Sequence, residues 1–365
     1  MKRIKLRAYF ARNLGDDLMV DILLRRYPQH KFWVNNTQLE TEVFRKYPNF
    51  ENRAALWEHY GRRNHIANLL TLNRKKDFLL HRMVQQRNKG CNGSVYIGGS
   101  LFMEGVRDTA EYIRQEEEKL DAGPLFIIGA NFGPYETEGF RAAFEEYFKK
   151  CAGITFRDQA SYRCFATLDN AAYAPDVVLN LPDAPKAGNG SVIISVIDVR
   201  SRPKLKEYTQ SYDRFIADTC QTCVAQGKKP VLMSFCESEG DCAAIERIKE
   251  LLPVEIREKI GVYAYNGNIP EALEQIAQAD FVLATRFHAM ILALCFEKPF
   301  FCLSYSDKIK WVLEDLGCDA YCDLKQISTL EPKDIFARYT QPVDAAAYRR
   351  EAQRQFAQLD EFLRK

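Results

Sequence analysis

The sequence lacks the features that define several large classes of protein. Its 51 lysines and arginines nearly balance its 49 aspartates and glutamates, so the formal net charge is only +2. A balanced charge without a long basic run argues against a nucleic-acid binder. No stretch approaches the roughly 20 apolar residues of a membrane-spanning helix, and the start, MKRIKLRAYF, alternates charged with apolar residues, unlike a signal peptide. We therefore expect a protein that acts in the cytoplasm.

The 11 cysteines lack the pattern of a disulfide framework or a zinc site. They are odd in number and mostly lie in apolar segments, which favours reduced thiols in a core. The pair Cys220 and Cys223 is in phase with Phe215 and Ile216 on one apolar face of a predicted helix. We predict that this pair is buried, and we expect neither a metal nor a cofactor.

Short apolar runs alternate with amphipathic segments along the chain, as in repeated β-α units. With 365 residues, the chain exceeds one typical core, so two domains are expected. A stretch of prolines, glycines and polar residues at 180–191 separates two series of units and predicts a linker. The fold class is therefore α/β, with two successive sheets. The predicted strands are 4–10, 30–34, 94–99, 125–130, 153–156, 192–197, 230–235, 262–266, 281–285 and 299–303.

Two segments stand apart from the β-α pattern. Residues 51–89, rich in arginine and asparagine, fit no β-α unit and are predicted to be an inserted helical lobe. Residues 344–365 form one long amphipathic pattern with no strand after it. This pattern predicts a terminal helix that packs back on a domain.

Polar and glycine-containing motifs follow the predicted strands directly, where open parallel sheets bind their ligands. Glycines there let the backbone approach a ligand and offer N–H donors, although a glycine can also simply permit a tight turn. Asp16 is either an acid that stabilises a helix start or a carboxylate that orients or deprotonates a hydroxyl. The other candidate binding residues from these motifs are Asn13, Gly98, Gly99, Ser100, Asn131 and Gly133.

Three arginines, Arg157, Arg200 and Arg286, each follow a predicted strand. If they converge on one crevice, they predict a small, multiply charged anion, because guanidinium forks suit carboxylate and phosphate. Two alternatives stay open: Arg157 has a local partner in Asp158, and Arg200 lies in a basic loop that water can solvate.

His288 lies one residue beyond Arg286, in the motif ATRFHAM. A histidine beside a strand-end arginine can bind an anion and deliver a proton near neutral pH. The alternative is a neutral histidine, hydrogen-bonded to backbone, that supports the turn. The other histidines fall in polar or helical regions of the N-terminal part: His30, His59, His65 and His81.

The motifs NLGDDLM, YIGGSLF, IGANFGPY, FRDQASY and APDVVL, together with RFHAMILALCFEKPFFCLSYSDKIKWVLEDLG, resemble the polysaccharide pyruvyl transferase family. The resemblance runs from about Ala8 to Gly317. It implies two Rossmann-like domains that face each other across a cleft, as in the GT-B glycosyltransferases. Residues 1–185 would be the acceptor side, with the insertion near 51–89, and residues 186–365 the donor side, with the terminal helix.

The resemblance also implies a reaction, in which the enolpyruvyl group of phosphoenolpyruvate moves onto a sugar as a cyclic ketal. Arg286 and His288 match the family's Arg-x-His donor pair, Arg157 matches the arginine of its RD motif, and Lys308 matches its Tyr-x-x-Lys helix. We assign His288, Arg286 and Asp16 to catalysis. The partners would be phosphoenolpyruvate and a glycan or a lipid-linked or nucleotide-linked sugar, through which the protein would associate with the inner face of a membrane.

Two alternatives to pyruvyl transfer stay open. The first is a GT-B nucleotide-sugar glycosyltransferase; against it, Cys295 stands where such enzymes commonly carry a glutamate that holds the donor ribose. The second is a non-catalytic relative that binds an anionic sugar, because a binding protein would keep the arginines too.

Overall fold

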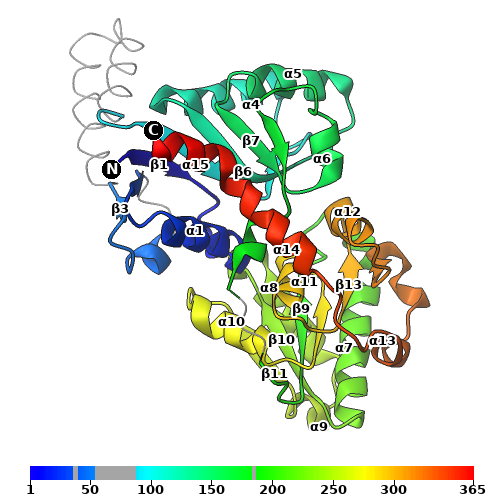
Figure 1. Ribbon diagram of the computed structural model, residues 1–365. Helices are drawn as coiled ribbons and strands as arrows, with labels where there is room; N and C mark the ends of the chain where they lie inside the picture. The colour runs from blue at the N-terminus through cyan, green and yellow to red at the C-terminus, as the bar shows by residue number, and fades with distance from the viewer. Residues whose placement is uncertain (36–39, 54–87, 183–185) are drawn as a thin grey trace, which may run out of the picture. The chain divides into compact units, whose positions relative to one another are not determined.

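Two parallel β-sheets form the framework of the protein (Figure 1). The computed structural model describes residues 1–35, 40–53, 88–182 and 186–365. The chain forms two compact units. Unit 1 comprises Met1–Phe10, Met19–Ala174 and Arg354–Lys365, and unit 2 comprises Ala11–Leu18 and Pro175–Gln353.

The sheet of unit 1 has the order β3-β2-β1-β4-β6-β7-β8, with β5 paired to β6, and its strand pairs are parallel. The strand order reverses between β1 and β4, which makes the carboxyl ends of these strands the expected place for a ligand. The strands are β1 Arg3–Arg7, β2 Lys31–Val34, β3 Phe50–Asn52, β4 Gly93–Ile97, β5 Ser100–Phe102, β6 Leu125–Phe132, β7 Gly153–Phe156 and β8 Ala171–Tyr173.

Aromatic side chains fill the core between the unit 1 sheet and its helices. Every residue of β6 is buried, as expected for a central parallel strand with both faces covered. The Phe132 ring lies edge-on to Phe165, with centroids 4.8 Å apart, and contacts Phe140 and Phe144 as well. The helices of this unit include α4 Thr109–Glu117, α5 Glu138–Phe148, α6 Gln159–Arg163 and α15 Ala357–Arg364, and most of α1 Leu14–Arg26.

The sheet of unit 2 has the order β11-β10-β9-β12-β13-β14 and is parallel. Its strand order reverses between β9 and β12. The strands are β9 Ser191–Val196, β10 Lys229–Ser234, β11 Gly261–Ala264, β12 Phe281–Ala284, β13 Phe300–Ser304 and β14 Tyr321–Asp323. The helices are α7 Thr209–Ala225, α8 Asp241–Glu250, α9 Val254–Arg257, α10 Ile269–Ala277, α11 Phe287–Cys295, α12 Asp307–Asp315, α13 Pro332–Arg338 and α14 Ala346–Ala352.

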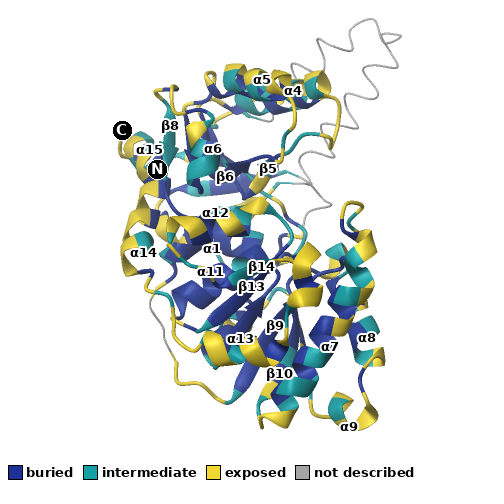
Figure 2. Ribbon diagram, turned by 90° about the vertical axis from the view of Figure 1, so that its right-hand side faces the viewer, coloured by how far each residue is buried: buried dark blue, intermediate teal, exposed yellow. Residues whose placement is uncertain are grey.

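Burial in unit 2 follows the apolar pattern of the sequence (Figure 2). All residues of β9 and β12 are buried, as are nearly all of α11. Cys220 and Cys223 are free thiols with no exposed surface on α7, so the predicted core position of this pair is confirmed. Burial raises the pKa of the Cys223 thiol to about 12.

Most predicted strands and helices are present, but four short strands, β3, β5, β8 and β14, were not predicted. Each has only three residues, too few for a pattern of period two to be recognised. One candidate binding residue, Ser100, begins such a strand, β5. The predicted insertion at 51–89 lies almost entirely outside the described residues.

The terminal segment is helical but is not the single predicted helix. It divides into α14, the 3-10 turn η7 (Gln353–Phe356) and α15. The prediction that its end packs back on a domain is confirmed, since Arg354–Lys365 belongs to unit 1. The predicted domain ranges 1–185 and 186–365 stay a prediction. The compact units divide the chain between Ala174 and Pro175 instead. Among the described residues, no helix combines the length and apolar character needed to cross a membrane.

Gln355, in the 3-10 turn of the terminal segment, connects this segment to the sheet of unit 1 and provides a test. Its side-chain oxygen accepts a hydrogen bond from the Gly129 N–H at 2.9 Å, and its amide donates to the carbonyls of Phe156 and Ala174 at 3.4 and 2.6 Å. Gln355→Ala removes the partner of the Gly129 N–H and of the Ala174 carbonyl, whereas the Phe156 carbonyl still accepts from the Ala174 N–H at 3.1 Å. We expect a loss of about 2 to 4 kcal/mol in the free energy of unfolding in urea. The exposed neighbour gives the control: Gln353→Ala should change it by less than about 0.5 kcal/mol.

Candidate functional site

In unit 1, the structure brings together predicted residues at or just after the ends of strands β4, β6 and β7. The Arg157 guanidinium donates to the Asn131 side-chain oxygen at 2.8 Å, and the Ser100 hydroxyl donates to the same oxygen at 3.4 Å. Gly99 lies against the guanidinium, because a Cβ on Gly99 would be 2.4 Å from Arg157 Nη1. Gly99 therefore serves close approach to the arginine, and Arg157 is only 2% exposed.

The local alternative for Arg157, a partner in Asp158, stays open, since burial raises the pKa of Asp158 while its hydrogen bonds with Ser161 and the charge of Arg157 act to lower it. The Asp158 carboxylate accepts from the Ser161 N–H at 2.7 Å and from its hydroxyl at 3.0 Å, and so caps α6. Two glycines of these motifs have simpler roles. A Cβ on Gly98 would meet the flexible Leu101 side chain, and Gly133 has a φ of +105°, which a turn with glycine accommodates.

In unit 2, Arg286 is the centre of a buried ion cluster. It is the N-cap residue of α11, directly after β12. Its Nε and Nη2 contact the two carboxylate oxygens of Asp241, the Nε at 3.2 Å, and its Nη1 lies 2.5 Å from Glu239. Burial alone would lower the pKa of Arg286, but the charges of Asp241 and Glu239 raise it above its ordinary value. Arg286 is therefore a permanent cation.

The turn that carries Arg286 is tied to the central strand of the sheet. The Ser195 hydroxyl, on β9, accepts from the N–H groups of Thr285 and Arg286 at 2.8 and 3.0 Å. Because β9 and β12 are the strands between which the order reverses, Arg286 lies where Rossmann-like sheets bind ligands.

Two cations lie close to the Tyr305 ring, just after β13. The guanidinium carbon of Arg202 lies 4.6 Å from the ring centre, and the Lys308 ammonium lies 5.6 Å from it. Burial alone would raise the pKa of Tyr305, but the charges of Lys308, Arg202 and Arg286 outweigh it and lower the pKa. A strongly positive environment therefore exists at the carboxyl ends of β9, β12 and β13.

Arg200 and Arg202 lie in the same loop but have different surroundings. Arg200, the arginine singled out from the sequence, is exposed. Arg202, two residues later, reaches the cluster, where its Nη2 lies 3.5 Å from Glu239. The role proposed for Arg200 stays a prediction, but the geometry favours Arg202.

His288 packs against the first turn of α1, within unit 2. A Cβ on Gly15 would lie 1.8 Å from His288 Nδ1, so only glycine leaves room for the ring. The other ring nitrogen, Nε2, lies 3.9 Å from Asp176, whose side chain has no exposed surface. A charged imidazole would thus have a buried carboxylate within ion-pair distance.

The remaining predicted residues of unit 2 come from the segment before and within that turn. Asn13 is 9% exposed; its oxygen accepts from the Gly15 N–H at 3.1 Å and its amide donates to Glu239 at 3.2 Å. Asp16 is half-buried in the first turn of α1. The adjacent Asp17 is fully buried and accepts from the Tyr265 hydroxyl at 2.8 Å. The structure therefore places Asn13 in the Arg286 cluster.

Three residues of the Arg286 cluster, Arg202, Glu239 and Asp241, were not selected from the sequence, and neither was Asp176 beside His288. Glu239 and Asp241 follow the predicted strand 230–235 in the motif ESEGD. The rule that selected Arg286, a polar residue after a predicted strand, could have found them. Burial alone would raise the pKa of Glu239, but Arg286 and Arg202 lower it below its ordinary value, so Glu239 is charged at neutral pH.

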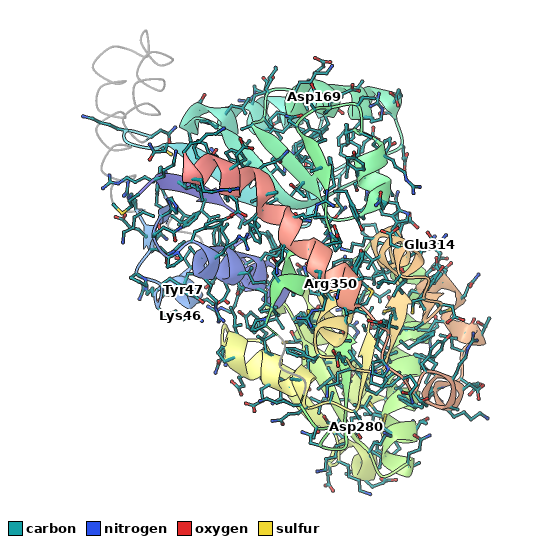
Figure 3. All side chains as sticks on the ribbon, in the orientation of Figure 1. Lys46, Tyr47, Asp169, Asp280, Glu314 and Arg350 are labelled. Atoms are coloured by element: carbon teal, nitrogen blue, oxygen red, sulfur yellow. The ribbon has the colours of Figure 1, made fainter. Side chains whose placement is uncertain are left out.

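A cavity of about 270 Å³ lies elsewhere in unit 2, beside Asp280, which is labelled in Figure 3. Its lining includes Phe281, the first residue of β12, and Pro299, just before β13. It is therefore at the amino ends of the strands, the edge at which such sheets do not bind ligands. Asp280 also has a structural role, because its carboxylate accepts from the Gly190 N–H at 3.3 Å.

The chain matches a family model described as polysaccharide pyruvyl transferase over residues 13–307. Among solved structures, it is similar to a protein from Listeria monocytogenes provisionally named UDP-N-acetylglucosamine 2-epimerase. The match covers 99% of this chain and 97% of that chain, with 11% identity and a TM-score of 0.54. At this identity the likeness concerns the fold alone, and the predicted class of two Rossmann-like, GT-B-like α/β domains is confirmed.

Two other solved structures are similar with lower TM-scores, and no argument rests on them. One is an α,α-trehalose 6-phosphate synthase from Burkholderia multivorans, with 10% identity, 100% of this chain and 95% of that chain covered, and a TM-score of 0.49. The other is TarM, with 12% identity, 74% of this chain covered and a TM-score of 0.43; the match spans 54% of the TarM chain.

The contact between Gly15 and His288 can be tested by adding one methyl group. Gly15→Ala forces the imidazole away from the first turn of α1, because the new Cβ would overlap the ring. We expect a clear change in the NMR signals of the His288 ring, while those of His30, in unit 1, stay in place. Gly139→Ala is the control, since a Cβ there meets nothing within 4 Å. Unchanged His288 signals in Gly15→Ala would contradict the described packing.

Proposed function

Because the chain belongs to the polysaccharide pyruvyl transferase family, we propose that it moves the enolpyruvyl group of phosphoenolpyruvate onto a sugar as a cyclic pyruvate ketal. The acceptor would be a polysaccharide or its lipid-linked or nucleotide-linked precursor. The family match supports a transferase that acts on polysaccharides. The identity of the donor and the formation of a ketal are our proposals. The expected place of action, the cytoplasm or the inner face of a membrane, remains a prediction.

The observation that carries the proposal is the cluster of cations around Tyr305. Phosphoenolpyruvate has a carboxylate and a phosphate, and guanidinium and ammonium groups at a strand-end site suit both. The charges of Lys308, Arg202 and Arg286 together lower the pKa of Tyr305 against the effect of burial. Glu239 and Asp241 offset part of this positive charge at Arg286, and Arg202 and Lys308 extend it toward the Tyr305 ring.

The reaction needs a proton donor as well as cations. The methylene carbon of the donor gains a proton, one sugar oxygen bonds to the neighbouring carbon, and the bond from that carbon to the phosphate oxygen breaks. A second sugar oxygen then bonds to the same carbon and closes the ring. The two hydroxyl groups lose their protons, and inorganic phosphate leaves.

His288 is our candidate for the proton donor. An imidazole is the side chain most suited to proton transfer near neutral pH, and its Nε2 lies 3.9 Å from the Asp176 carboxylate. Lys308 and Arg202 would neutralise the departing phosphate, so that its charge builds up beside fixed cations. Asp16, in the first turn of α1, is the candidate for orienting or deprotonating a hydroxyl of the acceptor.

Phosphate release tests the proposed reaction. The full-length protein is mixed with phosphoenolpyruvate and a panel of lipid-linked and nucleotide-linked glycans, and inorganic phosphate is measured against mixtures that lack one substrate. Release that requires both substrates supports pyruvyl transfer. Turnover of a nucleotide sugar instead would favour the glycosyltransferase alternative. Binding without turnover of any donor would favour the non-catalytic relative.

The contribution of Arg286 should not be tested by removing it. Arg286→Ala would leave the carboxylate of Asp241, which has no exposed surface, without its guanidinium partner. Breaking a buried ion pair in this way costs about 3 to 5 kcal/mol of stability. A loss of donor binding in that variant would then report unfolding as readily as a lost contact.

Arg202 and Arg200 form a better pair for testing the donor site. Arg202→Ala should weaken the binding of phosphoenolpyruvate about tenfold to a hundredfold, the range expected for one charge-assisted hydrogen bond. Arg200→Ala removes the same charge from an exposed position in the same loop and should change the affinity by less than about twofold. Isothermal titration calorimetry measures both, and equal effects of the two substitutions would contradict the placement of the site.

His288→Gln separates binding from proton transfer. If His288 is the general acid, the variant should keep most of its donor affinity while kcat falls about a hundredfold to ten-thousandfold. If His288 only supports the turn that carries Arg286, affinity and rate should fall together. His30→Gln serves as the control, because that ring accepts a hydrogen bond from the Lys2 N–H at 3.2 Å in unit 1. Near-normal turnover in His288→Gln would rule out the general-acid role.

A further inference from the structure

We propose that Glu239 sets the affinity of the anion site by competing with the bound anion for Arg202 and Arg286, so that the product phosphate can leave. As a statement about phosphoenolpyruvate turnover it rests on the proposed function; as a statement about anion binding it does not. Glu239 is then neither a proton donor nor a ligand to the substrate. It is a negative charge that limits how tightly the site holds an anion.

The contacts of Glu239 place it among the groups that would bind the ligand. One carboxylate oxygen lies 2.5 Å from Arg286 Nη1 and 3.5 Å from Arg202 Nη2. The other accepts from the Asn13 amide at 3.2 Å. These partners come from three separate loops, so the carboxylate occupies a position between two guanidinium groups, which is where a carboxylate or phosphate of a ligand would also be favoured.

Asp241 and Glu239 share Arg286 but are held very differently. The Asp241 side chain has no exposed surface, and its carboxylate also accepts from the N–H groups of Phe235 and Cys236, each at 3.0 Å. The Glu239 side chain is 26% exposed and lies on the 3-10 turn η5 (Glu237–Glu239). Asp241 is therefore the fixed counter-ion of Arg286, and Glu239 is the one that a ligand can replace.

Counting the donors of Arg286 leads to the same conclusion. A guanidinium group has five N–H donors. Asp241 takes one from Nε and one from Nη2, and Glu239 takes one from Nη1. Two donors remain for a ligand while Glu239 is in place. An anion that approaches Nη1 must share this nitrogen with Glu239 and lie close to a like charge.

The two effects of Glu239 have opposite signs, and their sizes decide between them. As a support for Arg202 it contributes little, because an ion pair at 3.5 Å with both side chains more than a quarter exposed is weak. Arg286 does not need it, because Asp241 already holds the guanidinium from the buried side. Repulsion of a multiply charged anion, in contrast, acts at close range in a partly buried site. Removal of the charge should therefore tighten anion binding.

The test is the binding of inorganic phosphate and of phosphoenolpyruvate to the full-length protein, measured by isothermal titration calorimetry at low salt. Glu239→Gln keeps the size of the side chain and removes its charge, and it should bind both anions about tenfold more tightly than the unaltered chain. Glu237→Gln is the matched control, because Glu237 is exposed on the same turn. It should change either affinity by less than about twofold.

The opposite results overturn the proposal. Weaker binding by Glu239→Gln would show that Glu239 supports the site, and equal binding would show that its charge does not act on the ligand. Glu239→Ala, in which no amide can replace the carboxylate, should also bind more tightly, and a support role would make it bind more weakly. Absence of phosphate binding in every form overturns the proposal as well. The two proposals can also fail separately. If Glu239→Gln binds phosphate more tightly but the unaltered chain does not turn over phosphoenolpyruvate, the proposed function is refuted and the role of Glu239 in anion binding stands.

Discussion

The buried ion cluster of Arg286 with Asp241 and Glu239 is the interaction on which the unit 2 site depends. It joins the N-cap of α11 to the start of α8 and to the turn after β10. Through Glu239 it also holds Asn13 and Arg202. Asp241 and Glu239 take three of the five N–H donors of Arg286, and the other two can serve a ligand. We propose that Arg286 is both a structural ion and a binding group, whereas Arg202 and Lys308 are mainly binding groups.

Much of the fold could be predicted because a parallel sheet buries both of its faces. Continuous apolar runs such as 192–197 and 281–285 therefore identify strands without any alternation. Three-residue strands such as β8 and β14 could not be found, because tertiary pairing rather than local pattern makes them. The contacts of Gln355 in the terminal segment could not be predicted either, because its partners Gly129, Phe156 and Ala174 are far away in the sequence.

The strand-end location of the candidate residues could be predicted, but not their pairing. Arg286 and His288 were selected because polar residues at the carboxyl ends of parallel strands are typical of ligand sites. The partners of Arg286 lie 45 and 47 residues away, and local spacing cannot show that an acid and a base this far apart form a pair. The choice between Arg200 and Arg202 has the same cause. Two arginines in one loop look alike until the fold directs one of them toward Tyr305.

The most direct test of the central claim is a crystal structure of the protein with phosphoenolpyruvate bound. We predict that the ligand lies at the carboxyl ends of β9, β12 and β13. One anionic group should lie within hydrogen-bond distance of Arg202 or Arg286, and another should lie near Lys308. A ligand bound at the amino ends of the strands, for example in the cavity beside Asp280, would contradict it. So would a ligand whose carboxylate and phosphate contact none of these three cations.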